Sequence, residues 1–328
     1  MSGGIINPSQ RTGILVIGAG LAGLCAATEL QRAGLDVLVI DKGRGVGGRL
    51  ASRRIGSATF DHGAQFMTAR TDRFRAAVQD WSARGLLRDW FHGTGDGHAR
   101  WCGQPSMTAV PKYLARGLNV LLDKKVSSLR HNASGWEVAL ESGESIQAGA
   151  VLLTAPVPQS LALLDAGGVA ILPAIRAQLE SIAYEPCIAV MATLSAPSKL
   201  PAPGGLALTE GPIGWLADNQ MKGISAVPAV TIHATPAYSL EHWDVDRPAT
   251  ARELLDAAGP WLGASVTGFQ VHAWRYARPA KVEPQPCLAL ADDHPLLLAG
   301  DAFGGQRVEG AALSGWAAAE ALLAAAAR

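Results

Sequence analysis

Apolar positions near the start of the chain form two short runs separated by a stretch of helical periodicity. Residues 13–17 are a continuous apolar run, as expected of a parallel strand buried on both faces. Residues 21–33 then have the pattern of a helix that Gly34 ends, and residues 36–40 form a second apolar strand followed by Asp41. The pattern therefore predicts one βαβ unit over residues 13–41.

Further along the chain, strand-like and helical patterns are mixed. Residues 119–150 alternate polar and apolar positions between turn residues, which predicts a β-meander, and residues 151–156 read as a buried strand closed by proline. Residues 296–299 predict a last buried strand, and the alanine-rich residues 310–327 predict a terminal helix. We also expect helices over residues 71–84, 171–182 and 250–258, and strands over residues 187–194, 229–233 and 266–274.

Composition and charge exclude several classes of protein. Of the 328 residues, 48% are hydrophobic and 17% are charged, which excludes a disordered chain. Lys+Arg and Asp+Glu both number 28, which argues against a general nucleic-acid binder. The most apolar long stretch, residues 151–175, contains three prolines and an aspartate and does not suit a membrane span. Without a signal-peptide pattern or a CxxC pair, we expect a cytoplasmic protein with free thiols, no metal and no membrane or nucleic-acid partner.

The turn between the first strand and the first helix has the spacing of a phosphate-binding loop, Gly18-Ala19-Gly20-Leu21-Ala22-Gly23. Gly18 permits the tight turn, Gly20 admits a pyrophosphate close to the backbone, and Gly23 lets the helix pack on the strand. The helix N-terminus offers unpaired N–H groups to the phosphates. Asp41, at the end of the second strand, stands where a carboxylate binds ribose hydroxyls. The unit therefore predicts a dinucleotide site, and this turn is shared by NAD and FAD proteins.

A second glycine-rich segment distinguishes between the two cofactors. Arg44-Gly45-Val46-Gly47-Gly48-Arg49 resembles the second glycine motif of the flavin amine-oxidase superfamily, where Arg49 would neutralise a phosphate. For Arg44, a solvated surface role and a phosphate role are equally open. Further segments resemble the same superfamily: residues 60–66, Val126, residues 151–156, Gly300-Asp301 and residues 309–315. Within the superfamily, the chain resembles the renalase family, particularly its bacterial members, over residues 41–49, 272–279, 300–303 and 307–310.

The resemblance implies a non-covalently bound FAD and a particular set of cofactor residues. Residues 60–66 would pass beside the flavin ring, the Val126 backbone would meet the adenine, and Asp301 would hold the ribityl or phosphate region. The N-terminus of the last helix would then stabilise negative charge on the reduced flavin. The cofactor residues implied are Gly18, Ala19, Gly20, Leu21, Ala22, Gly23, Asp41, Lys42, Arg44, Gly48, Arg49, Ala64, Gln65, Val126, Asp301, Gly310, Ala311 and Ala312.

The fold implied is α/β plus α+β, in two domains that are both discontinuous in sequence. Residues 1–60, 100–160 and 278–328 would build an FAD-binding domain of the Rossmann, glutathione-reductase-like type. Residues 61–99 and 161–277 would form a smaller substrate domain with a mostly antiparallel mixed sheet and helices.

The activity implied by the resemblance is oxidation of isomeric reduced nicotinamide nucleotides, 2- or 6-dihydro-NAD(P), to NAD(P)⁺. The hydride would pass to flavin N5, and O₂ would reoxidise the flavin to give hydrogen peroxide. A dihydropyridine is already a hydride donor, so no catalytic side chain is strictly required, and the protein needs only to hold the ring and exclude water. Trp274 and Tyr276 lie at i, i+2 on one face of an extended segment, with Arg275 facing the other way. The candidate pocket residues are Gln65, Asn219, His233, Trp274 and Tyr276.

Other functions remain open at this stage. An FAD-dependent amine oxidase and a related flavin hydroxylase or desaturase are the alternatives, followed by a non-enzymatic flavin-bearing module. A second nicotinamide-binding glycine fingerprint is not visible later in the chain, which counts against reductases that bind two dinucleotides. The residues leave open the C2 or C6 isomer, the NAD or NADP form, the oligomeric state and the physiological electron acceptor.

Overall fold

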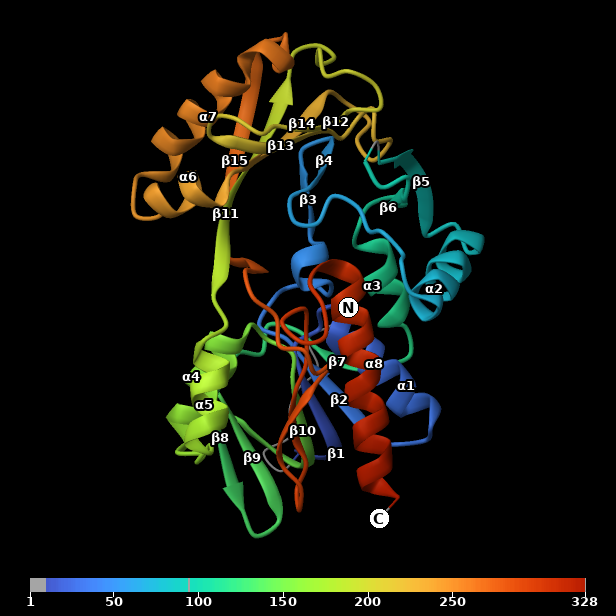
Figure 1. Cartoon of the computed structure of the whole chain (residues 1–328), viewed down its shortest axis with the longest axis vertical. Coiled ribbons are helices and arrows are strands. Elements are labelled where there is room, and N and C mark those ends of the chain that lie inside the picture. The colour runs from blue at the N-terminus through green and yellow to red at the C-terminus, as the bar shows by residue number, and fades with distance from the viewer. Residues whose placement is uncertain (1–9, 94, 328) are drawn as a thin grey trace. The chain divides into compact units, whose positions relative to one another are not determined.

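The computed structural model describes residues 10–93 and 95–327 of the chain (Figure 1). The chain divides into two compact units, and each unit is built from separate stretches of sequence. The first contains the described residues up to Gly48, Pro111–Ala183 and those from Pro279 onward. The second contains Arg49–Val110 and Tyr184–Arg278.

The described residues of the first unit form an eight-stranded sheet around a parallel centre. The strand order is β16-β17-β10-β1-β2-β7, and β8 and β9 extend it through an antiparallel pairing of β9 with β10. β1 lies between β10 and β2 and is parallel to both, and its last four residues, 14–17, are buried. The strands are β1 (Gln10–Ile17), β2 (Val37–Ile40), β7 (Asn119–Leu121), β8 (Val126–Asn132), β9 (Gly135–Leu140), β10 (Ser145–Leu153), β16 (Leu288–Ala291) and β17 (Leu296–Leu298).

Two helices pack together in the first unit, as Figure 1 shows for α1 and the red α8. They are α1 (Leu21–Arg32) and α8 (Arg307–Ala326). Their backbones approach closely because Gly315 has no side chain, and a Cβ there would lie 2.2 Å from the carbonyl oxygen of Ala22. None of the helices in the described ranges has both the length and the hydrophobicity that crossing a bilayer requires.

The βαβ prediction is confirmed, but the expected meander and the next strand are partly wrong. Residues 145–153 form the single strand β10, whose first half pairs with β9 and whose second half lies between β1 and β17. β7 pairs with β2 in parallel and is not part of the meander. Two further helices follow β10, α4 (Val157–Gly167) and α5 (Pro173–Glu180). α4 was not predicted, because Pro156 was read as the end of a strand, whereas it is the N-cap of a helix with Pro158 in its first turn.

The second unit contains a five-stranded sheet in the order β12-β13-β14-β11-β15. β12, β13, β14 and β11 pair antiparallel with their neighbours. The strands are β11 (Tyr184–Leu194), β12 (Gly205–Ala207), β13 (Ile213–Asp218), β14 (Ala229–Ala234) and β15 (Val266–Pro279). Two ribbons, β3 (Ser52–Ile55) with β4 (Ala58–Asp61) and β5 (Leu87–His92) with β6 (Ala99–Gly103), belong to the same unit. Its helices are the short η1 (Gly48–Leu50) at the unit boundary, α2 (Asp72–Ala83), α3 (Ala109–Leu114) at the other boundary, α6 (Pro236–Glu241) and α7 (Arg247–Leu262).

The two faces of the five-stranded sheet are chemically different. On β14, Val230 and Ile232 pack into the apolar core beneath α7. Thr231 and His233 alternate with them and hydrogen-bond instead to the last residue of β4 and to the residue after it. The polar face of this sheet, defined here as the face that carries Thr231 and His233, therefore lies opposite the α7 core.

The unit boundaries differ from the expected ones. Residues 49–60 and 100–110 lie in the second unit, because the β3–β4 ribbon contacts β14 and the backbone N–H of Met107 bonds to Asp61. Residues 161–183 lie in the first unit, where α4 packs against β8. Gly167 allows this packing, since a Cβ there would lie 1.4 Å from the Leu129 carbonyl oxygen.

The closeness of α1 to the preceding turn predicts a strong effect of a single methyl group. A Cβ on Gly23 would lie 2.0 Å from the Gly18 carbonyl oxygen. We expect Gly23→Ala to lower the free energy of unfolding by about 1–3 kcal/mol in urea titrations, as overpacking does. The control is Gly259→Ala in α7, where nothing lies within 4 Å of the new Cβ. Equal stability of both variants would contradict the prediction.

Candidate functional site

The turn from β1 into α1 has a backbone that only small residues permit. Gly18 has a φ of +115°, and its N–H donates to the Ile40 carbonyl oxygen at 2.8 Å. A Cβ on Gly20 would meet nothing within 4 Å. Protein atoms therefore enclose the turn at Gly18 and Gly23 but leave open space in front of Gly20.

The second glycine segment packs directly on this turn. The Gly47 N–H donates to the Ala19 carbonyl oxygen at 2.8 Å, and Gly47 forms a parallel bridge with Gly20. Gly48 has a φ of +54°, and a Cβ on it would lie 3.3 Å from the Gly20 Cα. The two glycine motifs predicted to bind phosphate are thus in contact.

Asp41 connects the turn to the loop that precedes β8. Its carboxylate accepts from the Ala19 N–H at 2.6 Å and from the Gly43 N–H at 2.7 Å. Its carbonyl oxygen accepts from the Lys124 N–H at 2.9 Å, so the chain leading to Val126 runs beside it. A carboxylate accepts about four hydrogen bonds, and the two N–H groups of Ala19 and Gly43 use two of these positions. The remaining positions on Asp41 suit ribose hydroxyls.

The C-terminal part of the first unit supplies a second helix N-terminus. The Gly300 N–H donates to the Ser314 hydroxyl at 2.8 Å, and Asp301 is buried directly after it. α8 begins with Arg307 at a φ of +71°, a conformation that is costly for a residue other than glycine. Gly310 lies so close to the preceding loop that a Cβ would be 1.8 Å from the Gly305 carbonyl oxygen.

These features fit an anionic dinucleotide. Neither α1 nor α8 has a side-chain hydrogen bond at its N-cap, so their first N–H groups suit phosphate or flavin oxygens. Lys42 donates to Gln159 at 3.1 Å, and Arg44 is exposed. The predicted cofactor residues in the first unit are Gly18, Ala19, Gly20, Leu21, Ala22, Gly23, Asp41, Lys42, Arg44, Gly48, Val126, Asp301, Gly310, Ala311 and Ala312, and those in the second are Arg49, Ala64 and Gln65.

Within the second unit, Arg49 and the predicted flavin-side segment lie together. The Ala64 N–H donates to the Arg49 carbonyl oxygen at 2.8 Å. The Arg49 guanidinium donates to the carbonyl oxygens of Tyr276 and Ala277 at 3.2 and 3.5 Å. Arg49 therefore connects this segment to the end of β15.

A buried ion pair lies at the start of the same segment. Asp61 and Lys222 are both 0% exposed, and Lys222 Nζ lies 2.7 Å from Asp61 Oδ2. The other carboxylate oxygen of Asp61 accepts from the Ser52 hydroxyl at 2.5 Å and the Met107 N–H at 3.0 Å. The carboxylate is thus fully bonded inside the protein.

Asn219 and Gln65, two of the predicted pocket residues, belong to the network around this ion pair. The Asn219 side chain is 0% exposed, accepts from the Asp61 N–H at 3.4 Å and donates to Thr231 Oγ1 at 3.0 Å. Both of its polar atoms are used within the core, and its predicted contact with a ligand stays a prediction. Gln65 is 6% exposed, and its Nε2 donates to the Asp61 carbonyl oxygen at 2.6 Å. Its predicted roles beside the flavin and in the pocket stay predictions.

The polar face of the sheet carries a group of aromatic rings, which we call the imidazole–indole cluster: His62, His233, His272 and Trp274. His62 and His272 stack with ring centroids 4.9 Å apart, and Trp274 lies 4.2 Å from His272. The His62 carbonyl oxygen accepts from Trp274 Nε1 at 2.9 Å and from His233 Nε2 at 3.2 Å. Two of the predicted pocket residues are therefore oriented by one backbone acceptor.

Burial keeps the imidazoles of this cluster neutral. Loss of solvent lowers the pKa of His62 to about 3 and that of His233 to about 4. The positive charge of Lys222 also depresses the His233 pKa. Burial lowers the pKa of His272 as well. At physiological pH the cluster therefore presents uncharged rings.

Three residues of this region were not selected as candidates from the sequence: His62, His272 and Lys222. The alternation that selected Trp274 and Tyr276 extends to His272 on the same face of β15, and that signal was available. The alternation itself is confirmed, since Arg275 lies 5.4 Å from the Trp243 ring, away from His62, while Tyr276 packs on Tyr184. Nothing in the local sequence marks Lys222 as a buried residue, because its partner is distant in the chain.

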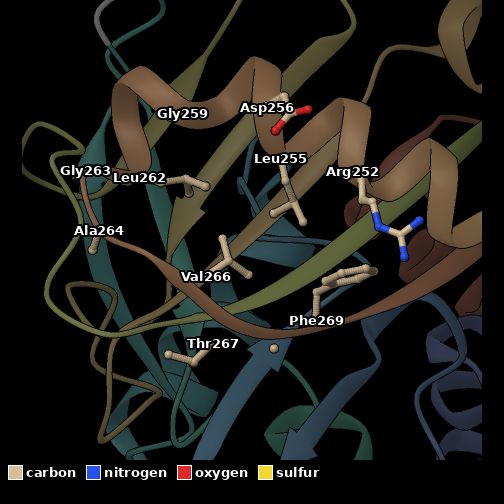
Figure 2. A pocket seen from close by; sticks show the side chains of 11 residues that line it. Arg252, Leu255, Asp256, Gly259, Leu262, Gly263, Ala264, Val266, Thr267 and Phe269 are labelled. Carbon is tan, nitrogen blue, oxygen red and sulfur yellow. The ribbon is translucent and has the colours of Figure 1, made fainter.

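A different hollow lies beneath α7 and is lined by none of the predicted site residues. Figure 2 shows Arg252, Leu255 and Asp256 of α7 beside Val266 and Phe269 of β15. Its volume is about 720 Å³. The hollow lies on the α7 side of the sheet, whereas the imidazole–indole cluster lies on the polar face.

Comparison with known families agrees with this arrangement. A model of flavin-containing amine oxidoreductases matches residues 85–323, and one of NAD(P)-binding Rossmann-like domains matches residues 16–81. The chain belongs to the flavin-containing amine oxidoreductase family. Its cofactor is FAD, it is an FAD-dependent oxidoreductase, and the predicted Rossmann-type α/β plus α+β fold is confirmed.

Individual relatives within and around this family agree with the predicted resemblance. Renalase of Mus musculus is 27% identical over 291 residues, which are 81% of this chain and 84% of that protein. The flavin-dependent monooxygenase pboD of Aspergillus ustus is 27% identical over 164 residues, 45% of this chain and 33% of that protein. The solved structure of a putrescine oxidase variant superposes with a TM-score of 0.72 at 15% identity, covering 97% of this chain and 100% of that chain. The resemblance to renalase is confirmed, and the structural match supports the fold.

The open space at Gly20 predicts a variant that folds but binds FAD weakly. Gly20 has φ −75° and ψ 179°, which alanine also adopts. We expect Gly20→Ala to leave the melting temperature of the apoprotein unchanged and to weaken FAD binding about 10-fold or more, because the methyl group occupies the pyrophosphate's approach. Fluorescence titration of the apoprotein with FAD measures this, and Gly259→Ala is the control. Unchanged affinity would contradict the phosphate role of the turn.

The depressed pKa values of His62 and His233 predict acid sensitivity. Between the ordinary histidine pKa of about 6.5 and the folded values of about 3 and 4, the unfolded chain binds protons that the folded chain excludes. Stability should therefore fall as pH is lowered from about 6.5 towards 4, by up to about 1.4 kcal/mol per pH unit for each histidine. His62→Phe keeps a flat ring beside His272 and should reduce this slope. Urea unfolding of the FAD-loaded protein at several pH values measures it, and identical slopes would refute the assignment.

Proposed function

We propose that this protein is an FAD-dependent oxidase of isomeric reduced nicotinamide nucleotides, 2- or 6-dihydro-NAD(P), which produces NAD(P)⁺ and hydrogen peroxide. The similarity to renalase over 81% of the chain supports this substrate class. The observation that carries the proposal is the uncharged imidazole–indole cluster on the polar face of the second unit's sheet.

The chemistry of a dihydropyridine matches an uncharged aromatic surface. The substrate loses a hydride from C2 or C6 and becomes an aromatic pyridinium ring, so no proton needs to be removed from carbon. Bound FAD supplies the two-electron acceptor at N5 and passes the electrons to O₂, which takes up two protons to form hydrogen peroxide. An imidazole with a pKa of about 3 or 4 is a poor base, and this cluster contains two such rings.

The chain's own groups then have positioning roles. Trp274 and His272 offer ring faces and edges against which a planar nicotinamide ring packs. Neutral imidazoles also avoid repelling the positively charged product ring. Tyr276 and His233 complete the proposed pocket, with His233 held through its Nε2 and Trp274 through its Nε1.

We also propose a division of labour between the two units. The first unit holds the dinucleotide part of FAD through the two glycine motifs, Asp41 and the N-termini of α1 and α8. The second unit supplies the substrate-binding surface. The contact between the two glycine motifs supports the first assignment, and the cluster supports the second.

This prediction concerns which compounds reduce the flavin, and so remove its visible absorbance, under anaerobic conditions. We expect 2- or 6-dihydro-NAD(P) to reduce the enzyme at least about 100-fold faster than 4-dihydro-NAD(P) or a primary amine, a difference of about 2.7 kcal/mol in barrier. The rate should change little with pH across the neutral range, because the substrate has no amine to deprotonate. Anaerobic stopped-flow absorbance measures both properties.

The same experiment separates the alternatives. Rapid reduction by a primary amine or polyamine, increasing with pH and without reduction by either isomer, would make the protein an amine oxidase. Fast reduction by ordinary 4-dihydro-NAD(P) would indicate a flavin hydroxylase. Either outcome would overturn the proposed substrate class.

A further inference from the structure

The buried lysine of the second unit stands directly behind the chain that carries His62. Lys222 is 0% exposed, and its Nζ contacts Asp61 Oδ2 at 2.7 Å and Gln65 Oε1 at 3.5 Å. The ammonium also lies 5.0 Å from the centre of the Trp90 ring. The ammonium therefore lies in the interior of the unit, with Asp61 as its counter-ion.

A buried ion pair of this kind is not explained by stability alone. Removing two charges from water is costly, and apolar side chains of similar volume often stabilise a fold equally well. What the pair does provide is a fixed geometry, because the Asp61 carboxylate is held from three directions by Lys222, Ser52 and the Met107 N–H.

Hydrogen bonds, together with the backbone between Asp61 and His62, connect Lys222 to the imidazole–indole cluster. The Asp61 carbonyl oxygen accepts from Gln65 at 2.6 Å and from Thr231 at 3.0 Å. The next carbonyl in the chain, that of His62, accepts from Trp274 and His233. A displacement of Asp61 would therefore move the acceptor that orients both side chains.

We propose that Lys222 is a positioning residue, which fixes residues 61–65 through Asp61 and thereby orients Trp274 and His233 for the substrate ring. The part concerning the substrate rests on the proposed function. The lysine acts through its hydrogen bond to Asp61 and contacts neither substrate nor cofactor.

The charge of Lys222 adds a second effect that a neutral residue would not give. It opposes protonation of His233, whose pKa is lowered mainly by burial. Loss of the charge should therefore raise the His233 pKa, and this change is measurable by NMR independently of any turnover.

The experiment compares Lys222→Met, Asp61→Asn and the double variant, all loaded with FAD. Lys222→Met leaves a buried carboxylate without its partner and should lower the melting temperature most. The double variant removes both charges and should regain much of that loss. Its rate of flavin reduction by the dihydronicotinamide isomer should nevertheless stay about 10- to 100-fold below that of the unmodified enzyme, because Asp61 no longer fixes the segment.

The matched control is Leu254→Ala, which weakens the core of the same unit on the α7 side of the sheet. It should lower the melting temperature while the reduction rate falls less than about 3-fold, a change of about 0.65 kcal/mol in barrier. Recovery of both stability and rate in the double variant would show that Lys222 is merely structural, and would overturn the proposal.

A second readout needs no substrate. The indole N–H resonance of Trp274, assigned by its loss in Trp274→Phe, reports the hydrogen bond to the His62 carbonyl. It should shift in Lys222→Met and in the double variant but not in Leu254→Ala. If no dihydronicotinamide isomer reduces the unmodified enzyme, the proposed substrate class fails, while this resonance still tests the positioning role. An unshifted resonance in both Lys222 variants would overturn it.

Discussion

Close approach of backbone to backbone around α1 is the constraint on which the first unit depends. Gly23 brings the helix against Gly18, Gly48 brings the second loop against Gly20, and Gly315 brings α8 against Ala22. A Cβ on Gly23 or Gly315 would overlap the neighbouring backbone, and one on Gly48 would press tightly against Gly20. The result is that both glycine motifs and the packed helices α1 and α8 lie around one short turn.

The second unit is organised around a buried charged residue, Asp61, whereas the first unit depends on glycines. Asp61 is bonded through its carboxylate, its N–H and its carbonyl oxygen, to partners from the β3–β4 ribbon, the loop after β13 and strand β14. A buried network of this kind, with both carboxylate oxygens hydrogen-bonded, restricts the arrangement of the chain that follows. The neutral rings of the imidazole–indole cluster are placed by that chain.

The features predicted best from the sequence are those that depend on residues close together in the chain. The βαβ unit, both glycine motifs and the alternating faces of β15 follow from short-range spacing, and all appear in the structure. The core hydrogen bonds of Asn219 and the burial of Lys222 were not foreseen, because both depend on Asp61, which is more than a hundred residues away in the chain. The unit boundaries were misplaced for the same reason, since the β3–β4 ribbon joins the second unit through contacts with β14 that no local pattern reveals.

Trp274 and His233 both donate to a main-chain oxygen, that of His62, and this determines what a substitution at position 62 changes. Every amino acid carries the same carbonyl, so replacement of His62 by another residue leaves the attachment point of both rings in place. A substitution at position 62 therefore keeps this acceptor for both side chains and changes only the ring that packs against His272 and Trp274.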